Sequence, residues 1–359
     1  MTTALDVDVK EVKVTTVSSF DEVSALYHDI QKRNDQPLMN SFVWLNTWYK
    51  NYWQDQWQLH CFIIYQNDKL IAIAPFYMQK YTRFPFLKSL HLIGQGEPEI
   101  KEVASEYLDV NIKGKYHHEL YPKIADAITK IDFDILVVSA ILKDSHIANI
   151  AKMLSENLQI RHCCRYLVNR ETWQKKTISK NTRSRIKRSN NQLNQLNAEV
   201  RWFSNDEIKC YWPALKEFHQ KRWHKCGQSG AFLSQEFNKF HLSLIEKNKD
   251  SVAMSGIFVN DAPIAINYYL VDETTYYFYQ SGWDEENYAK LSPGLYLHYW
   301  SIEHCPHQYY DFMMGSLKDS YKAKFAGDNI PMQSLLYIKN KPKYFLSQLA
   351  MKLKHKLRW

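Results

Sequence analysis

The stretch that decides the fold is Tyr276–Phe325, YYFYQSGWDEENYAKLSPGLYLHYWSIEHCPHQYYDFMMGSLKDSYKAKF. The aromatic run at 276–280 has the composition of a strand and ends at a Ser-Gly pair. The Ser-Pro-Gly triplet at 292–294, followed by apolar residues, is typical of a helix start, and 308–314 predicts a second short strand. The unpaired N–H groups and the dipole at such a helix start favour negative charge, so we expect an anion site there.

The length and composition favour two globular domains. The chain has 359 residues, of which 45% are hydrophobic and 14% aromatic, enough for two cores. No run approaches the ~20 apolar residues of a transmembrane helix. The N-terminus does not read as a signal peptide, and six cysteines without a CxxC pair favour reduced thiols. We therefore expect a cytoplasmic protein. The cysteines are Cys61, Cys163, Cys164, Cys210, Cys226 and Cys305.

The net charge of +8 is concentrated in two segments. The first is a basic helix predicted over 178–196, which is either a solvated face or a phosphate-binding face. It lacks the zinc-finger or aromatic signatures of a nucleic-acid module, so no specific nucleic acid is expected. The second is the tail 341–359, which as a helix is amphipathic and cationic. A membrane surface bearing anionic lipid, packing against the body and disorder all remain open for it.

Two hairpins indicate an internal duplication. The segment IYQNDKLIAIAPFY, with its turn at Asn67, aligns with IFVNDAPIAINYY, whose turn is at Asn260. Each has an Asn-Asp turn followed by an Ile-Ala-Ile strand, although chance similarity between hairpins would also explain this. The interpretation divides the chain into domains at 1–170 and 171–340, followed by the tail. Since only the second copy precedes the Ser-Pro-Gly helix start, the anion site is expected in that domain alone.

Five motifs carry a resemblance to a known family. The chain is similar to the GNAT-type N-acyltransferase superfamily, and within it to the CelD/BcsL-like branch, itself related to Fem-type aminoacyltransferases. The resemblance implies an α+β fold of two tandem GNAT-like domains, each a mixed, mostly antiparallel central sheet flanked by helices, with a degenerate first domain. The motifs are RSRIKRSNNQL, EFHQKRW, NDAPIAINYYL, YQSGWDEENYAKLSPG and YYDFMMGSLKDSYKAKF.

The resemblance implies acyl transfer from a thioester carrier to an amine. The carrier is expected to be acyl-CoA, such as acetyl-CoA, with acyl carrier protein left open. A backbone N–H within 281–283 would stabilise the developing oxyanion. The family's pyrophosphate loop is incomplete here, because Ala289 replaces an Arg or Gln and Pro293 has no N–H. The residues expected to contact the carrier are Gly282, Trp283, Lys290, Ser292, Gly294 and Leu295.

Four residues are candidates for catalysis, each with a structural alternative. Tyr321 matches the family's acid beside the thioester sulfur, and is otherwise a core tyrosine. Asp311 is charged inside an apolar strand, so it is a base, an amine ligand or half of a salt bridge, for example to Lys322. His219 is a base or a satisfied buried histidine. Asp284 orients substrate or caps a turn.

The acceptor site is expected to involve Trp223, Arg183 and Lys187, and the acceptor itself to be a small molecule with an amine on a polar, cell-envelope or polysaccharide precursor. No metal is expected, because the histidines and cysteines lack ligand spacing on any one element. Two alternatives remain: a Fem-type enzyme that takes its donor from aminoacyl-tRNA, and a non-catalytic scaffold for polysaccharide assembly at the inner face of the membrane.

Overall fold

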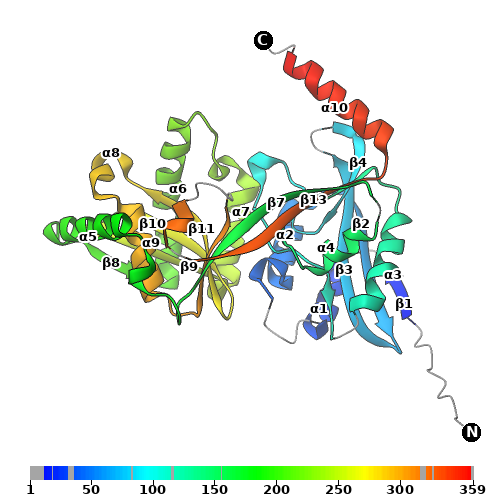
Figure 1. The fold of residues 1–359 in the computed structure, drawn as a ribbon, viewed down its shortest axis with the longest axis horizontal. Helices are drawn as coiled ribbons and strands as arrows, with labels where there is room; N and C mark the ends of the chain where they lie inside the picture. The colour runs from blue at the N-terminus through cyan, green and yellow to red at the C-terminus, as the bar shows by residue number, and fades with distance from the viewer. Residues whose placement is uncertain are drawn as a thin grey trace, which may run out of the picture.

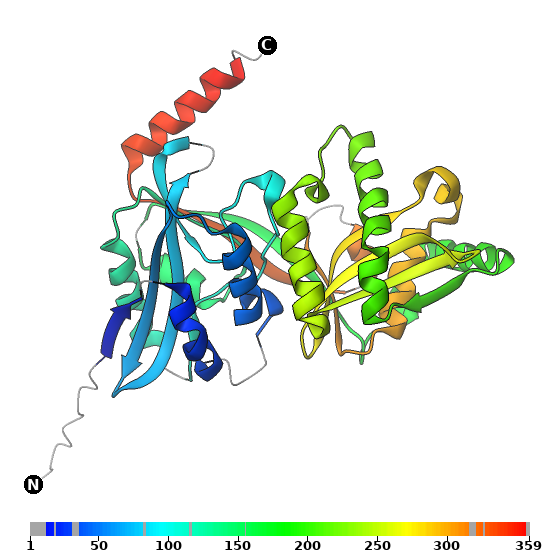
Figure 2. The same cartoon turned by 180° about the vertical axis from the view of Figure 1, so that it is seen from behind.

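The computed structural model describes residues 12–17, 19–30, 36–81, 84–114, 117–154, 156–315, 321–325 and 327–356. Figure 1 shows two halves side by side, joined by long strands in the middle, with one helix extending from the body near the C-terminus. The reverse view in Figure 2 shows the same division. The predicted α+β class, with a mixed and mostly antiparallel sheet flanked by helices, is confirmed.

The thirteen strands in the described parts of the chain belong to one sheet. Its order is β1-β2-β3-β4-β6-β13-β7-β12-β11-β10-β9-β8, and β5 pairs with β3 away from this path. The strands are β1 (Val12–Thr16), β2 (Gln58–Gln66), β3 (Lys69–Tyr81), β4 (Phe84–Leu92), β5 (Asn111–Ile112), β6 (Ile135–Leu142), β7 (Leu158–Asn169), β8 (Glu199–Trp202), β9 (Val252–Val259), β10 (Ala262–Val271), β11 (Thr275–Trp283), β12 (Tyr309–Gly315) and β13 (Asp328–Ile338).

Ten α-helices flank this sheet in the described parts of the chain. They are α1 (Ser24–Ile30), α2 (Phe42–Tyr52), α3 (His117–Thr129), α4 (His146–Lys152), α5 (Lys180–Gln195), α6 (Asn205–Lys225), α7 (Gln235–Lys247), α8 (Glu285–Tyr288), α9 (Pro293–His304) and α10 (Lys341–Lys356). Serine caps begin several of them: Ser41 precedes α2, and Ser204 forms a capping box with Glu207 at α6.

The two halves exchange their central strands. Strand β13, from the end of the chain, lies between β6 and β7, and β7 lies between β13 and β12. All of these contacts are antiparallel, with β13 and β7 paired over ten residues from Asp328↔Leu167 to Tyr337↔Leu158. Each half therefore completes its sheet with a strand from the other, and the halves cannot separate without breaking this ladder.

The two hairpins with Asn-Asp turns have similar backbone geometry. Asn67 and Asp68 connect β2 to β3 with φ of 47° and 57°, and Asn260 and Asp261 connect β9 to β10 with 50° and 61°. Two consecutive residues with positive φ form the tight turn that matches strand twist, and Asn and Asp tolerate this conformation best. The same Asn-Asp pair therefore builds the same hairpin in each half.

Two sequence predictions need correction. The segment 107–110 has a sequence typical of a strand, but it is irregular in the structure, and the short strand β5 follows it. Strand β13 was not predicted, because its segment DNIPMQSLLYI contains a proline and lacks regular alternation. Its pairing partners are more than 150 residues away in sequence, so nothing local indicates it.

Candidate functional site

Strands β11 and β12 separate after three residues of pairing. They run parallel, with Thr275, Tyr276 and Tyr277 opposite Tyr309, Tyr310 and Asp311, and the ladder ends there. Strand β11 continues to Trp283 paired on its other edge with β10. Among the described strands, none pairs with the second edge of β11 from Phe278 onward, so the backbone groups on that edge make no ladder hydrogen bonds there.

A bulge in β12 turns this strand away from β11. The register with β7 shifts between Asp311 and Met314, and Met313 has a φ of 61°. That conformation is unfavourable for a residue with a side chain and needs support from its surroundings. Asp311 supplies it by accepting a 2.7 Å hydrogen bond from the N–H of Met313.

Side chains replace the hydrogen bonds that β11 would otherwise make to this bulge. Glu106, from a loop of the first half, accepts a 2.7 Å bond from the N–H of Met314. The Lys322 ammonium group donates to the carbonyl groups of Phe312 and Met314. Three ionisable side chains, those of Asp311, Glu106 and Lys322, thus form hydrogen bonds with backbone groups of the separated strand β12. These bonds explain how β12 stays apart from β11 without a further strand between them.

Burial shifts the pKa values in this charged group. Desolvation raises the pKa of Glu106 to about 7, opposed by the nearby Lys322. Desolvation also raises the pKa of Asp311, although Arg165 opposes it with an ion pair of 3.1 Å between Nε and Oδ2. The orientation of these two atoms does not allow a hydrogen bond between them, so the contact is a charge pair.

The separated strands lead into a pocket of about 340 Å³, within the size range of small-molecule sites. Three cations line it, and every lining residue belongs to the second half of the chain rather than to the boundary between the halves. The lining residues are Arg185, Arg222, Ser281, Trp283, Ala289, Ser292, Gly294, Leu295, His298, Tyr321, Lys324 and Phe325.

Helix α9 begins at this pocket without a side-chain cap. Its N-cap residue, Ser292, has left-handed φ and ψ of 51° and 50°, and no side chain caps the helix. Pro293 has no N–H, and the N–H of Leu295 bonds back to the carbonyl of Ser292 at 3.1 Å. The N–H of Tyr296 bonds to the same carbonyl. In the described first turn of α9, Gly294 therefore has the one N–H without such a bond. The helix end therefore offers fewer donors than a complete phosphate loop, and the three cations supply most of the positive charge.

Tyr321 lies in the pocket beside a histidine that the sequence did not indicate. Tyr321 is 44% exposed, yet desolvation of its hydroxyl group raises its pKa above the ordinary value, with Arg222 acting in the opposite direction. Its ring centroid lies 5.8 Å from that of His298. His298 Nδ1 lies 2.9 Å from the Tyr310 hydroxyl, and burial lowers its pKa to about 3. At neutral pH this pocket thus holds a protonated tyrosine beside a neutral imidazole.

Other predicted catalytic residues lie outside the pocket lining. His219 is buried between Trp223 and Phe232, with ring centroids 5.6 and 4.7 Å away, and burial lowers its pKa to about 4. Asp284 accepts a 3.1 Å bond from the N–H of Asn287 and so caps α8. Asp311 is fully buried at the bulge.

The residues predicted to bind the carrier divide into two groups. Trp283, Ser292, Gly294 and Leu295 line the pocket. Gly282 instead faces α6, because a Cβ there would lie 2.9 Å from backbone atoms of Leu215 and His219. Lys290 is exposed and is not among the lining residues.

The predicted acceptor residues also lie elsewhere. Arg183 donates to the carbonyls of Lys176 and Ile178, which fixes the start of α5. Lys187 lines a separate groove between α5 and α9. Trp223 is 38% exposed near the end of α6.

Sequence reasoning missed four polar residues of the pocket. Arg222 and Lys324 lie within quoted motifs, next to Trp223 and in the SYKAKF segment, but helical or turn periodicity does not show which way they face. Arg185 is one of several charges on the basic helix, and its spacing does not distinguish it from the others. His298 follows the Ser-Pro-Gly start by one turn, and its isolated position on an apolar helix gave no chemical signal.

The equivalent opening in the first half is closed. Strands β4 and β6 also run parallel for two residues, from Ser89↔Ile135 to Leu90↔Leu136. The side chain of Gln95 then enters the space beyond, donating to the carbonyls of Ser105 and Ser139 at 2.8 and 2.7 Å and accepting from the N–H of Ser139 at 3.0 Å. Gln95 thus bridges the two strands at the point where their ladder ends.

Within the described residues, no group of three or more His, Cys, Asp or Glu is placed to hold a metal ion. Nor does this part of the chain contain a helix with the length and apolar character needed to cross a bilayer.

Comparison with known proteins agrees with the position of the pocket. Residues 180–323 match the family model described as the acetyltransferase (GNAT) domain. This segment contains every pocket residue except Lys324 and Phe325. No curated protein matches the chain in sequence.

Solved structures share the fold along the whole chain. A conserved protein of unknown function from Bacteroides thetaiotaomicron has a TM-score of 0.57 at 12% identity, covering 91% of this chain and 100% of its own. FemX also has a TM-score of 0.57, at 10% identity, covering 93% and 99%. The C-terminal domain of a putative lysylphosphatidylglycerol synthetase from Agrobacterium fabrum has 0.55 at 8% identity, covering 94% and 96%. At such identities the likeness concerns the fold alone.

Proposed function

We propose that the chain is an N-acyltransferase that moves an acyl group from a thioester carrier to an amine, with the pocket at the end of β11 and the start of α9 as its catalytic centre. The observation that carries this proposal is the separation of the two strands after Tyr277 and Asp311, which opens directly onto the uncapped start of α9. The match of residues 180–323 to the GNAT domain supports the same reaction class.

The unpaired edge of β11 suits the acyl group. A thioester in the gap would have its carbonyl oxygen near backbone N–H groups of the 281–283 segment, which would stabilise the negative charge that develops when an amine attacks. Formation of the carbon–nitrogen bond breaks the carbon–sulfur bond. The amine nitrogen loses one proton and the departing thiolate takes up one, so the step balances when the acid that protonates the thiolate is later restored by the proton from the amine. Tyr321, protonated at neutral pH and placed at the pocket, is the proposed donor of that proton.

Three cations suit a phosphorylated carrier such as acyl-CoA. Arg185, Arg222 and Lys324 reach the pocket from α5, α6 and the turn after β12. Guanidinium and ammonium groups form the strong charge-assisted bonds that phosphate oxygens accept. They would compensate for the missing Arg or Gln at Ala289 and the missing N–H of Pro293. Acyl carrier protein, whose phosphopantetheine arm also bears a phosphate, remains a second carrier of the same chemistry.

The acceptor is proposed to be an amine on a polar cell-envelope or polysaccharide precursor, an assignment that rests on the CelD/BcsL-like motifs. The attacking amine must be neutral. His219 and Asp311 remain candidates for roles around it, but the burial of both favours support of the site over direct proton transfer. Trp223, Arg183 and Lys187 remain candidates for acceptor contacts on the outer surface.

A second candidate function is transfer from aminoacyl-tRNA. Its support is the fold shared with FemX, together with the exposed cations of α5. The groove between α5 and α9, of about 760 Å³, is lined by Lys175, Lys180, Arg183 and Lys187 as well as aromatic residues. Such a surface could accept a polyanion larger than CoA.

Titration calorimetry with CoA and acetyl-CoA tests the first proposal. In Gly294→Glu, the new carboxylate would occupy the pocket beside the expected diphosphate, so binding should be lost. The Cβ of residue 294 would meet only Trp283, at 3.7 Å, so the variant should fold. Gln195→Glu adds the same charge at an exposed position of α5 outside the pocket lining and serves as the matched control.

The outcomes separate the candidates. CoA binding that is lost in Gly294→Glu and kept in Gln195→Glu supports the thioester-dependent enzyme. Absence of CoA binding, with the aminoacyl ester of tRNA protected from hydrolysis by the protein, supports the second candidate. If neither ligand binds, both proposals are wrong and a non-catalytic role is favoured.

A further inference from the structure

Helix α10 leaves the body with an uncovered apolar face. Phe345 and Leu346 are 63% and 59% exposed, the highest values among the large hydrophobic residues that the structure describes, and Leu349 is 40% exposed. Residue 349 is four positions after 345 and three after 346, so the three side chains lie on one face of α10 and form a stripe. Figures 1 and 2 both show the helix extending away from the two halves.

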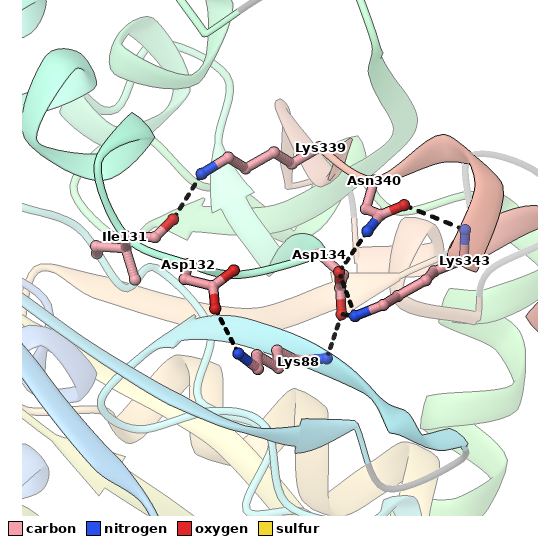
Figure 3. A network of polar contacts seen from close by, with 7 residues as sticks. All are labelled: Lys88, Ile131, Asp132, Asp134, Lys339, Asn340 and Lys343. Atoms are coloured by element: carbon pink, nitrogen blue, oxygen red, sulfur yellow. Dashed lines mark hydrogen bonds and ion pairs between the residues drawn. The ribbon is translucent and has the colours of Figure 1, made fainter.

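The base of α10 is nevertheless firmly attached. Asp134, only 3% exposed, accepts bonds from the side chains of Asn340 and Lys343 at 2.9 and 3.2 Å, and from the N–H of Lys88 at 2.9 Å. Its own carbonyl accepts from the N–H of Lys339 at 2.9 Å. Figure 3 shows these contacts converging where the chain enters the helix.

Further contacts fix the direction of the helix. The Lys339 ammonium group donates to the carbonyls of Thr129 and Ile131 at 2.7 and 2.6 Å. Asn340 caps the helix by accepting a 3.2 Å bond from the N–H of Lys343. On the inner side, Tyr344 packs against Leu87 and Ile135. The body therefore determines where α10 points, while the outer stripe is left without a partner among the described residues.

The charge of the helix indicates what covers that stripe. The segment 341–356 reads KPKYFLSQLAMKLKHK and contains five lysines and no acidic residue. Lys343 pairs with Asp134, and the sequence places four more lysines, at 341, 352, 354 and 356, on the same helix. An apolar stripe beside several lysines fits the boundary between the acyl chains and the head groups of an anionic bilayer, where apolar burial and charge attraction act together.

We propose that α10 docks the protein on a membrane surface rich in anionic lipid, inserting Phe345, Leu346 and Leu349 at the head-group level while its lysines contact lipid phosphates. A second copy of the chain is a poorer partner, because apposed copies of α10 would bring lysine-rich helices of equal charge together. This inference does not depend on the proposed acyl transfer.

The test is flotation of the full chain with vesicles of equal parts phosphatidylglycerol and phosphatidylcholine, compared with pure phosphatidylcholine. The wild-type protein should float with the anionic vesicles and much less with the neutral ones, and salt should weaken the binding. Phe345→Ser combined with Leu346→Ser should lower the partition coefficient by at least about tenfold, given the apolar area withdrawn from the bilayer.

The matched control is Ile100→Ser combined with Leu233→Ser. Both residues are 52% exposed but lie in other elements, so this variant should bind like the wild type. Equal binding by the α10 variant and the wild type, equal binding to neutral and anionic vesicles, or no binding at all would overturn the proposal. So would a lipid-free dimer that the α10 variant converts to a monomer, because the stripe would then be an interface between copies. Unchanged thermal unfolding of both variants would establish that each is folded.

Discussion

Tyr277 and Asp311 face each other at the last pair of the ladder between β11 and β12, and the site opens directly beyond them. Both are buried, at 3% and 0% exposure, so the opening begins inside the core rather than at the surface. Asp311 also holds the Met313 bulge through its N–H. The Asp311 carboxylate thus lies at the end of the pairing and stabilises the bend that follows it. This contact explains structurally why a charged residue is buried here.

Glu106 should make the stability of the chain depend on pH. Its pKa is raised from an ordinary value near 4.5 to about 7, so between these values the folded state keeps a proton that the unfolded state has lost. The free energy of unfolding should therefore fall as pH rises through this window, by about 3 kcal/mol at most. In Glu106→Gln the amide oxygen can still accept from Met314, and this loss should disappear. Urea unfolding at pH 5 and pH 8 measures it, and equal pH slopes in both proteins would contradict the assignment.

The two glycines at the site should respond differently to alanine. In Gly282→Ala the new Cβ would lie 2.9 Å from backbone atoms of α6, so the helix must shift, at a cost of at least about 2 kcal/mol. In Gly294→Ala the nearest atoms belong to Trp283 at 3.7 Å, so stability should change by less than about 0.5 kcal/mol. Urea unfolding of both variants measures the two changes in the free energy of unfolding. Equal losses would mean that Gly282 does not pack against α6 as closely as its position indicates.

Local sequence patterns predicted the helix and the hairpins around the site. The contacts between distant segments that assemble the site could not be predicted in this way. Ser-Pro-Gly marked the start of α9 and the Asn-Asp turns marked both hairpins, because capping and turn chemistry depend on neighbouring residues. The pairing of β13 with β7 and β6 joins segments more than 150 residues apart, which no local pattern encodes. The charged Asp311 indicated a buried partner, but the sequence could not show that the partner is Arg165 rather than Lys322.

Gln95 should contribute to the stability of the first half, because its side chain bonds to the backbone where the ladder between β4 and β6 ends. Gln95→Ala would leave buried carbonyls of Ser105 and Ser139 and the N–H of Ser139 without their present partner, at a cost of about 2–4 kcal/mol. Gln195→Ala, at an exposed position of α5, should cost almost nothing. Urea midpoints of both variants provide the comparison. A loss below about 1 kcal/mol in Gln95→Ala would show that other groups fill this space.

Tyr321 can be tested as the proton donor because its hydroxyl is the only group that Tyr321→Phe removes. If the departing thiolate takes its proton there, kcat should fall by roughly 10²–10⁴-fold, the usual range for general acids, while CoA affinity by calorimetry should stay the same. Tyr288→Phe, in α8 outside the pocket lining, is the matched control. Turnover is followed as thiol release from acetyl-CoA in the presence of an amine acceptor.

The pH dependence adds an independent readout for Tyr321. Since its pKa is raised above the ordinary value of 10, the hydroxyl keeps its proton throughout the neutral range, and loss of this acid can lower the wild-type rate only in strongly alkaline solution. Tyr321→Phe should therefore be slow at every pH between about 6 and 9 without shifting the shape of the profile there. A variant that is slow only because the pocket has changed shape should also bind CoA more weakly, and one with the wild-type rate would remove Tyr321 from the mechanism.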